Sequence, residues 1–364
     1  MKQVQTQMTI VLLVHDIHFG GGGERVAINL ANYFVEKVSH VIIVSLSQPK
    51  TRNIFTIDKR IGIEYLEINF EYGSNLINKI TSVFKINKHF NNYQGQTIVL
   101  GIGNYPSLLL CLLPKRKNIK TVGCQHLAYS GIKNSWALLR NIFFNRLDRI
   151  VSLTNRDLSK YKSLNKNSVV IPNSISPCPK NPALLTNKRI LFIGRMVYEK
   201  GYDILIEVLK KINARHPDWV FRIIGDGPLK NSIVEKIEVS GLKENISLIS
   251  STNLITEEYL KASMFLMTSR TEGLPMVLLE AQVCGLPIVC FDCETGPSDI
   301  VTDNKNGFLI DCYDIDKMTE RISLLCIDYD LRLKFGRNAV ENVKKFSPEI
   351  INSKWDKLFE ELSR

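Results

Sequence analysis

Two cations stand five positions apart in the stretch LFIGRMVYEKG, in the second half of the chain. Arg195 directly follows a predicted strand, and Lys200 comes just before a predicted helix. A guanidinium is a planar fork and an ammonium is a point charge, and both bind phosphate oxygens. Two such groups on one loop can therefore converge on a diphosphate. Solvated loop charges are the alternative interpretation.

The stretch TSRTEGLPMVLLEAQVCGLPIVC carries two carboxylates eight positions apart, and it is the most specific in the chain. A predicted strand leads into Glu272 and a turn at Gly273. Pro275 stands near the first position of a predicted helix, whose N-terminus suits a phosphate. Glu280 lies inside this helix among mostly apolar residues, so its charge is costly without a partner. Vicinal hydroxyl groups of a ligand are one such partner, and a structural arginine is another.

Two glycine-rich turns follow predicted strands. Gly20 to Gly23, in HFGGGGERVAINLANYF, precede a helix that we expect to begin at about Glu24. Glycine lets the backbone approach a ligand closely, and a helix N-terminus favours an anion. This turn is not the dinucleotide fingerprint, because Arg25 holds the third glycine position, and a flexible turn is the alternative. In FRIIGDGPLK, Gly225 precedes Asp226, which either contacts a ligand or caps the next helix.

Neither the cysteines nor the paired aspartates predict a metal site. Among eight scattered cysteines only Cys290 and Cys293 form a CxxC, so we expect them to pack in a core. Asp-x-Asp strings, which hold divalent metals in other transferases, begin at Asp314 and Asp328. Both strings stand where predicted helices begin, so helix capping explains them more simply. We expect no metal and no other cofactor.

The elements that must position these residues alternate along the whole chain. Short apolar runs rich in Val and Ile are separated by longer segments of helical period, a pattern typical of parallel sheets wrapped by helices. The strands predicted in the first half span residues 8–15, 40–46, 61–68, 97–100, 120–124, 149–153 and 168–171. Those predicted in the second half span residues 189–193, 220–224, 245–249, 264–268, 288–291 and 307–310.

A length of 364 residues predicts two domains, each with its own core. The best linker runs from Pro172 to Lys188 and contains four prolines. It divides the chain into residues 1–172 and 173–346, which a last helix over 347–364 follows. No apolar run is long enough to span a membrane, and the run from Met8 to Val14 predicts a first strand and not a secretory signal.

The net charge of +11 is unevenly distributed. Residues 1–175 hold 22 Lys or Arg against 9 Asp or Glu, a net of +13, whereas the remainder holds 25 against 27, a net of −2. This asymmetry predicts an anionic partner for the first half, either a nucleic acid or an acidic membrane surface. A solvated basic face is the alternative.

A predicted helix in IKNSWALLRNIFFNRLDR favours the membrane over nucleic acid. It has an apolar stripe at helical spacing and cations to flank it, namely Trp136, Leu139, Phe143 and Leu147 with Lys133, Arg140 and Arg146. Such a helix can lie in a membrane interface, although the inner face of a core helix explains the stripe equally well. We expect a cytoplasmic protein, peripheral on the inner face of the plasma membrane, with no nucleic acid partner.

In this order and spacing, GGGGER, GRMVYEKG, GDGPLK and EGLPMVLLE resemble the motifs of glycosyltransferase family four, which are retaining enzymes of the GT-B fold. The resemblance extends from about Met8 to the last helix, and Glu272 to Glu280 matches the family's Glu-x7-Glu motif. It implies an α/β fold of two Rossmann-like domains that face each other across a cleft. A nucleotide diphosphate sugar, expected to be a UDP-sugar, would bind mainly to the second domain, and the last helix would cross back to the first.

The resemblance also implies roles for single residues. Glu280 would bind the donor ribose, Glu272 the transferred sugar, and Arg195 with Lys200 the diphosphate. His126, in CQHLAYS, aligns with a histidine near the reacting sugar, and a structural role is the alternative. The other expected donor contacts are Gly22, Gly23, Gly225, Asp226, Gly273, Leu274, Pro275 and Met276.

The implied reaction transfers a hexose or N-acetylhexosamine, with retention, to a saccharide or polyprenyl-linked acceptor. The departing phosphate oxygen would accept the acceptor proton on the same face of the sugar. A TGPSDI string at Thr295 to Ile300 resembles bacterial members that build surface polysaccharides. The segment from Ser250 to Asn253 departs from the family pattern, because it lacks the usual glycine. The resemblance therefore does not specify the nucleobase pocket at this segment. A nucleotide-sugar epimerase and a non-catalytic nucleotide-sugar-binding protein are the alternatives.

Overall fold

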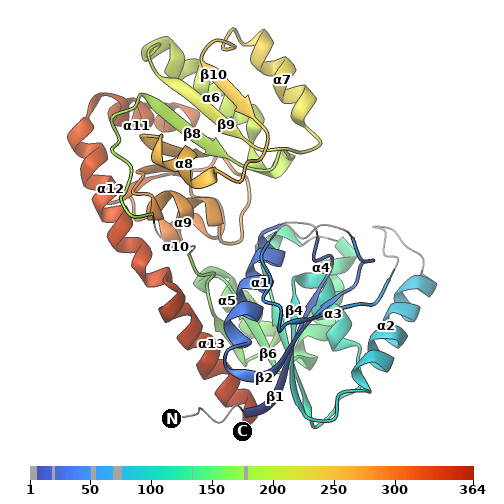
Figure 1. Ribbon diagram of the computed structural model, residues 1–364. Coiled ribbons are helices and arrows are strands. Elements are labelled where there is room, and N and C mark those ends of the chain that lie inside the picture. The colour runs from blue at the N-terminus through green and yellow to red at the C-terminus, as the bar shows by residue number, and fades with distance from the viewer. Residues whose placement is uncertain (1–5, 19–20, 51–54, 69–75, 133, 176–178) are drawn as a thin grey trace. The chain divides into compact units, whose positions relative to one another are not determined.

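The computed structural model of the chain describes residues 6–18, 21–50, 55–68, 76–132, 134–175 and 179–364 (Figure 1). The chain forms two compact units. Unit 1 comprises Met1–Asn173 with Ile351–Arg364, and unit 2 comprises Ser174–Ile350. The sequence places the boundaries at 172/173 and 346/347, so the second boundary falls a few residues later, inside the last helix.

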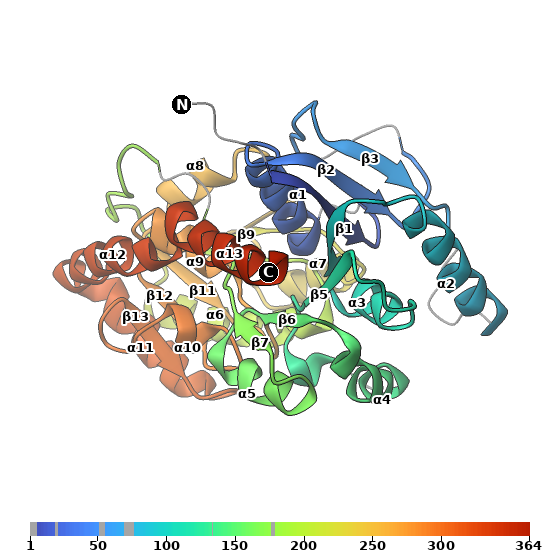
Figure 2. The same ribbon diagram turned by 90° about the horizontal axis from the view of Figure 1, so that it is seen from below.

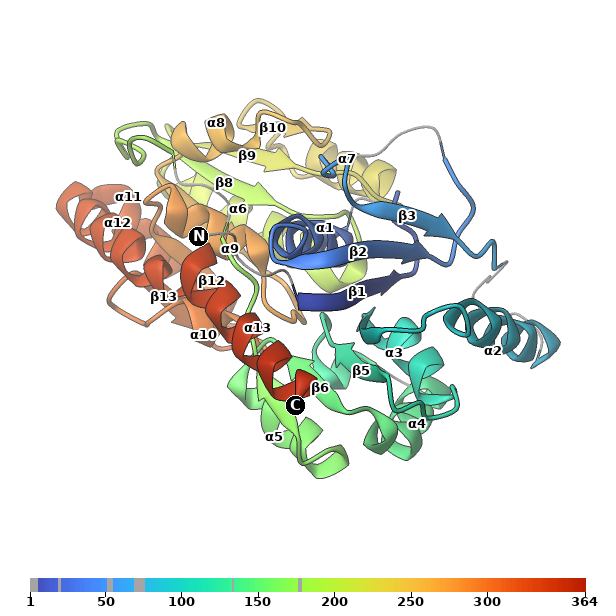
Figure 3. The ribbon, with the colours of Figure 1, turned by 60° about the horizontal axis from the view of Figure 1, so that its bottom comes forward.

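Unit 1 is built on a seven-stranded sheet in the order β3-β2-β1-β4-β5-β6-β7, and every adjacent pair of strands is parallel (Figure 3). The strands are β1 (Thr6–Val14), β2 (Val38–Ser45), β3 (Gly62–Tyr65), β4 (Gln96–Ile102), β5 (Ile119–Cys124), β6 (Arg149–Ser152) and β7 (Ser168–Val170). The strand order reverses between β1 and β4, and ligands of open α/β sheets bind at the carboxyl ends of such strands.

The helices of unit 1 are α1 (Gly22–Phe34), α2 (Leu76–Phe90), α3 (Asn104–Cys111), α4 (Asn134–Phe143), α5 (Asn155–Leu164) and most of α13 (Pro348–Ser363), with 3-10 turns at Tyr129–Gly131 and Phe144–Arg146. Strand β1 is apolar on both faces because helices cover both sides of the sheet. Ile10 and Leu12 point into one core cluster, and Val11 points into the other. Helix α13 closes the first cluster, where the ring centroids of Phe34 and Phe359 are 4.5 Å apart.

Unit 2 has a six-stranded parallel sheet in the order β10-β9-β8-β11-β12-β13. Its strands are β8 (Arg189–Ile193), β9 (Val220–Ile224), β10 (Ile246–Ile249), β11 (Met264–Met267), β12 (Ile288–Phe291) and β13 (Gly307–Ile310). Its helices are α6 (Tyr202–Arg215), α7 (Lys230–Val239), α8 (Ile255–Leu260), α9 (Met276–Val283), α10 (Pro297–Ile300), α11 (Ile315–Ile327) and α12 (Tyr329–Val343), with 3-10 turns at Tyr198–Lys200 and Lys344–Phe346. The two parallel sheets confirm the predicted α/β class.

The Asp-x-Asp strings of unit 2 cap helices, as predicted. Asp314 accepts a hydrogen bond from the backbone N–H of Lys317 at the start of α11, and Asp328 accepts one from Leu331 at the start of α12. Among the described residues, no His, Cys, Asp and Glu side chains gather in a way that could hold a metal ion. Burial raises the pKa of the Cys293 thiol to about 12, and Cys290 is also buried, as packing residues are. Cys178 lies outside the described residues.

Helix α4 does not present the predicted stripe outward, and this interpretation was wrong. Trp136, Leu139 and Phe143 pack against the core of unit 1, which contains Leu147. Arg140 is only 2% exposed, because it donates to the carbonyl oxygen of Tyr129 at 2.7 Å and its guanidinium lies 3.4 Å from the centre of the Tyr129 ring.

The exposed face of α4 carries two apolar residues. Leu138 is 62% exposed and Ile142, one turn later, is 51% exposed. Figure 2 shows α4 at the rim of unit 1, and the helix contacts α3. Of the predicted flanking cations, Arg146 donates to the carbonyl oxygen of Leu113, and Lys133 lies outside the described residues. No helix in the described parts of the chain is long and apolar enough to cross a bilayer.

Candidate active site

The motif residues of unit 2 gather where its strands end. Arg195 follows β8, Asp226 follows β9, and Glu272 follows β11. Because the strands are parallel, their carboxyl ends meet at one edge of the sheet. The loops at this edge are joined to one another by backbone and side-chain contacts.

The loops after β8 and β9 interlock through their backbones. The N–H of Met196 donates to the carbonyl oxygen of Asp226 at 2.8 Å, and the N–H of Leu229 donates back to Met196 at 3.1 Å. A Cβ at Gly225 would collide with the carbonyl oxygen of Gly194. The close approach that the sequence predicts at Gly225 is therefore an approach to a neighbouring loop. Arg195, in the same loop, is exposed.

Lys200 and Glu272 form the central ion pair of this edge. The Nζ atom of Lys200 lies 2.6 Å from Oε1 of Glu272, and the two side chains are 25% and 9% exposed. Gly201 turns the chain beside the carbonyl oxygen of Thr268 with a φ of +66°, where a Cβ would clash. Thr295, fully buried, donates to the carbonyl oxygen of Glu272 at 2.6 Å. The predicted cation and the predicted carboxylate are thus in direct contact.

Sequence reasoning missed Arg270, which joins the loops after β8 and β11. Its guanidinium donates to both carboxylate oxygens of Asp203, at 3.0 and 2.6 Å, and lies 4.1 Å from the ring centre of Tyr198. Hydrogen bonds from Arg270 lower the pKa of Asp203. An arginine in TSRTEG and an aspartate in the first turn of α6 are 67 positions apart, so only the fold reveals their pairing.

Glu280 is half-buried on α9 and accepts a hydrogen bond from a tyrosine. The hydroxyl of Tyr259, which is 1% exposed, donates to Oε2 of Glu280 over 3.0 Å. The sequence suggested an arginine as the structural partner. Helix α9 begins at Met276, so Pro275 is its N-cap residue, and no side chain caps the helix. Gly273 and Leu274 complete the turn between Glu272 and this N-terminus.

Asp226 does not cap α7, and that alternative was wrong. Leu229 is the N-cap residue, because Gly227 and Pro228 separate Asp226 from the helix. The carboxylate accepts from Nζ of Lys230 at 2.7 Å and from the N–H of Ser251 at 2.8 Å. These bonds lower the pKa of Asp226 to about 2. Asp226 therefore holds Ser251 in place. Ser251 belongs to the segment from Ser250 to Asn253, where we expected the nucleobase pocket.

The remaining predicted residues lie at the carboxyl edge of unit 1. Helix α1 begins at Gly22, after the N-cap residue Gly21, and no side chain caps it. Gly23 follows in its first turn, and Gly20 lies outside the described residues. His126 follows β5, and both of its ring nitrogens are buried although the residue as a whole is partly exposed. Burial lowers the pKa of His126 to about 4, so the ring is neutral at physiological pH.

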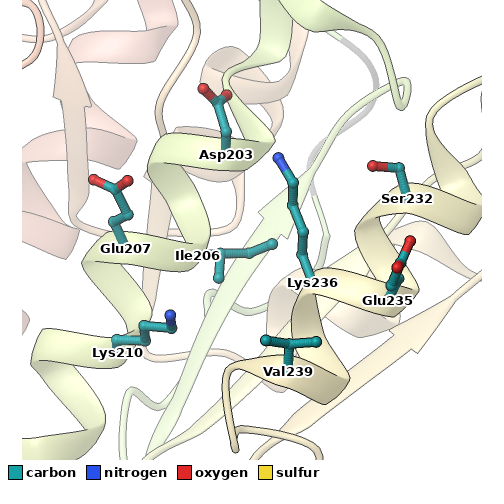
Figure 4. A pocket seen from close by; sticks show the side chains of 8 residues that line it. All are labelled: Asp203, Ile206, Glu207, Lys210, Ser232, Glu235, Lys236 and Val239. Carbon is teal, nitrogen blue, oxygen red and sulfur yellow. The ribbon is translucent and has the colours of Figure 1, made fainter.

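A cavity of about 400 Å³ opens between the outer faces of α6 and α7 (Figure 4). It is lined by Asp203, Ile206, Glu207, Lys210, Ser232, Glu235, Lys236 and Val239. None of the predicted site residues lines this cavity, and its walls carry charges of both signs. We therefore place the candidate site at the strand ends and not here.

Two doubly wound parallel units, the second with cations, a carboxylate and an uncapped helix N-terminus at its strand ends, fit a transferase that binds an anionic donor. The family model described as glycosyl transferases group 1 matches residues 179–342. An uncharacterized glycosyltransferase of Methanocaldococcus jannaschii is 30% identical over 259 residues, 64% of this chain and 71% of the relative. The chain therefore belongs to the group 1 glycosyl transferase family and is a glycosyltransferase.

Relatives match over the whole length as well. The amylovoran biosynthesis glycosyltransferase AmsD of Erwinia amylovora is 26% identical over 358 residues, which cover 95% of this chain and 98% of the relative. The crystal structure of a mutant of S. aureus TarM, in complex with fondaparinux, alpha-GlcNAc-glycerol and UDP, superimposes with a TM-score of 0.82. It shares 19% sequence identity and covers 96% of this chain and 99% of its own, so it shows a common fold.

Proposed function

We propose that the enzyme transfers a hexose or N-acetylhexosamine from a UDP-sugar to a saccharide or lipid-linked saccharide acceptor in surface polysaccharide synthesis, with retention at the anomeric carbon. The observation that carries this proposal is the contact between Lys200 and Glu272, because it puts a cation for the diphosphate beside a carboxylate for the sugar. The name of the amylovoran biosynthesis relative supports a role in polysaccharide synthesis, and the UDP bound to TarM supports the donor.

In this proposal the donor lies along the carboxyl edge of unit 2. Glu280 accepts hydrogen bonds from the ribose hydroxyls, and Arg195 and Lys200 bind the diphosphate. The N-terminus of α9, which begins at Met276 and has no side-chain cap, adds a partial positive charge that favours the phosphates. Asp226 and Gly225 hold the loops on the nucleobase side.

Lys200 and Glu272 then exchange their mutual contact for contacts to the donor when it binds. Without a ligand, Glu272 neutralises Lys200, so neither charge is left unpaired in a half-buried position. A diphosphate offers Lys200 a stronger anionic partner. Glu272 is then available to accept from a hydroxyl of the transferred sugar, and one charge-assisted hydrogen bond replaces another.

Catalysis rests on neutralising the leaving diphosphate. Negative charge grows on the bridging phosphate oxygen as the glycosidic bond breaks, and each cation aimed at it is worth roughly 2–4 kcal/mol. The same oxygen accepts the proton of the acceptor hydroxyl on the same face of the sugar. His126, neutral because its ring nitrogens are buried, can position a hydroxyl there but adds no charge. The scheme uses no cofactor.

We also propose that unit 1 docks on the cytoplasmic face of an anionic membrane. Twelve Lys or Arg lie between Lys115 and Lys166, opposed only by Asp148 and Asp157. The outward face of α4, with Leu138 and Ile142 exposed, replaces the predicted stripe as the apolar contact. Each surface cation near acidic lipid contributes on the order of 1 kcal/mol, so the attachment would be reversible and sensitive to salt.

A panel of nucleotide sugars, incubated with the enzyme in excess chelator and read by mass spectrometry, tests the proposed reaction. We expect a UDP-hexose or UDP-N-acetylhexosamine to release UDP slowly by hydrolysis and faster with a saccharide acceptor. A 1H NMR spectrum of the product gives the anomeric configuration. Inversion, dependence on an added divalent metal, or preference for another nucleotide would each contradict the corresponding part of the proposal.

A further inference from the structure

Two polar side chains at the carboxyl edge of unit 1 bury atoms that have no hydrogen-bond partner within the described part of the chain. They are the Oδ1 atom of Asn104 and both ring nitrogens of His126. Buried polar atoms are paired in the great majority of cases, and each unpaired one is costly. Unpaired atoms just past two neighbouring strands indicate a place where a ligand supplies the missing bonds.

The sheet places these two residues just past the ends of neighbouring strands. Strands β4 and β5 are adjacent and parallel, and Ile102 is in register with Cys124. Asn104 and His126 each follow their paired residue by two positions. The N–H of Gly103 donates to the carbonyl oxygen of Cys124 at 2.7 Å, which keeps the two chains together as they leave the sheet.

Aromatic rings border the position of Asn104. The ring of Tyr105, the next residue, lies edge-on to His15 with centroids 6.1 Å apart, and to Trp136 of α4 with centroids 5.6 Å apart. His15 follows β1, whose Leu13 is in register with Gly101 of β4. Tyr105 and Trp136 pack against the core of unit 1, so these contacts fix the chain beside Asn104.

Two other amides of unit 1 have hydrogen-bond partners. Gln125, beside His126, is 3% exposed and donates to Oγ of Ser107 at 3.0 Å. Asn118, at the opposite edge of the sheet, donates to the carbonyl oxygens of Tyr93 and Gly95 at 2.9 and 3.2 Å. These two amides of unit 1 are therefore paired within the fold, unlike the Oδ1 atom of Asn104.

We propose that Asn104 and His126 form the binding pair for the acceptor saccharide, and that Asn104 determines specificity by accepting a hydrogen bond from one acceptor hydroxyl. A sugar hydroxyl both donates and accepts, so adjacent hydroxyls of one pyranose ring can satisfy the amide oxygen and a ring nitrogen together. This inference rests on the proposed function, since it names the acceptor contacts of the same enzyme.

The test compares Asn104→Ala and Asn104→Leu with Asn118→Ala, a matched variant of a paired amide. Saturation-transfer NMR measures binding of methyl glycosides of glucose, galactose, N-acetylglucosamine and N-acetylgalactosamine in the presence of UDP. Calorimetry measures UDP binding, and thermal unfolding gives Tm. We expect at least one glycoside to bind the wild type, and its Kd to rise about tenfold or more in both Asn104 variants with unchanged UDP affinity.

The Tm values distinguish a ligand contact from a structural one. Removal of an unpaired amide should leave Tm unchanged or raised in Asn104→Leu, whereas Asn118→Ala should lower Tm and leave glycoside binding as in the wild type. A fall in Tm for both Asn104 variants, unchanged glycoside binding, or no bound glycoside in the wild type would overturn the inference. An increase in the KM for the UDP-sugar alone would assign Asn104 to the donor. Failure to bind UDP at all would instead contradict the proposed function.

Discussion

The two units present different chemistry at equivalent edges of similar sheets. In unit 2 the charged groups are paired across loops, as in Lys200 with Glu272 and Arg270 with Asp203. In unit 1 the corresponding edge also holds an ion pair, Lys50 with Asp16, in the loops after β2 and β1. Past β4 and β5, however, it holds Asn104 and His126, whose buried atoms have no partners among the described residues. Unit 1 carries 25 basic against 12 acidic residues, and unit 2 carries 22 against 24. A balanced, cross-linked edge suits a fixed anionic ligand, whereas neutral unpaired groups suit a hydroxyl-rich one.

The largest expected effect is that of Glu280→Ala, which removes the proposed ribose partner from unit 2. Transfer should fall by at least about 10³-fold while the protein stays folded, because water cannot replace a half-buried carboxylate that binds two hydroxyls. Tyr259→Phe is the matched control, since it deletes the same hydrogen bond and keeps the carboxylate. It should keep activity within a few-fold. Near-normal donor affinity and rate in Glu280→Ala would remove Glu280 from the site.

In unit 1 the largest effect should be a dependence of stability on pH. The pKa of His126 is about 4 in the folded protein, against an ordinary value of 6.5, so the unfolded chain binds the proton first as the pH falls. The stability is complete above pH 6.5 and is lost progressively toward pH 4, by as much as about 3 kcal/mol. Urea unfolding at several pH values measures it, and His126→Gln should flatten this part of the curve. Equal slopes for both proteins would show that His126 titrates normally.

A smaller effect is expected for Glu272→Ala. It should appear in the kinetics with the UDP-sugar and not in the affinity for free UDP. The KM for the UDP-sugar or the kcat should worsen by about tenfold, because one sugar contact is lost. Affinity for free UDP should not fall, since Lys200 loses the carboxylate that neutralises it. Calorimetry with UDP, set against steady-state kinetics, separates the two. Parallel weakening of UDP and UDP-sugar binding would contradict a contact to the transferred sugar.

The smallest effect concerns the membrane and sharpens the charge difference between the units. Sedimentation with liposomes should show binding that rises with the fraction of anionic lipid and falls with salt. Leu138→Asp should weaken it several-fold, because it puts a negative charge on the exposed face of α4. Leu254→Asp, at a similarly exposed leucine of unit 2, is the control. No binding to acidic vesicles at low salt would favour a soluble acceptor.

Much of the fold could be predicted from the sequence, because each of the predicted strands overlaps an observed one. Buried parallel strands read as continuous apolar runs, and this signal is local. The apolar stripe on α4 was predicted to face a membrane, but it packs against the core of unit 1. Helical periodicity shows which face is apolar, and it does not show whether that face contacts lipid or protein. Arg140 also has its aromatic partner eleven positions away, which its own segment does not reveal.

Some residues of the site could likewise be predicted from the sequence, and others could not. Glu272, Glu280 and Lys200 stood out because glycines and charges at fixed spacing in one stretch have few structural explanations. The hydrogen bond from Tyr259 and the unpaired oxygen of Asn104 carried no such signal. Whether a polar atom has a partner depends on the packing of distant segments, and it becomes visible only in the folded chain.

The central claim is that the donor binds at the edge of unit 2 and the acceptor at the edge of unit 1. Hydrogen–deuterium exchange with mass spectrometry, with and without UDP, tests it in one measurement. UDP should protect peptides that cover residues 194–201 and 270–280 and leave peptides over 102–106 and 124–128 unchanged. A saccharide acceptor, added with UDP, should protect the latter pair. Protection by UDP that is confined to unit 1, or that is absent from 194–201 and 270–280, would contradict the account.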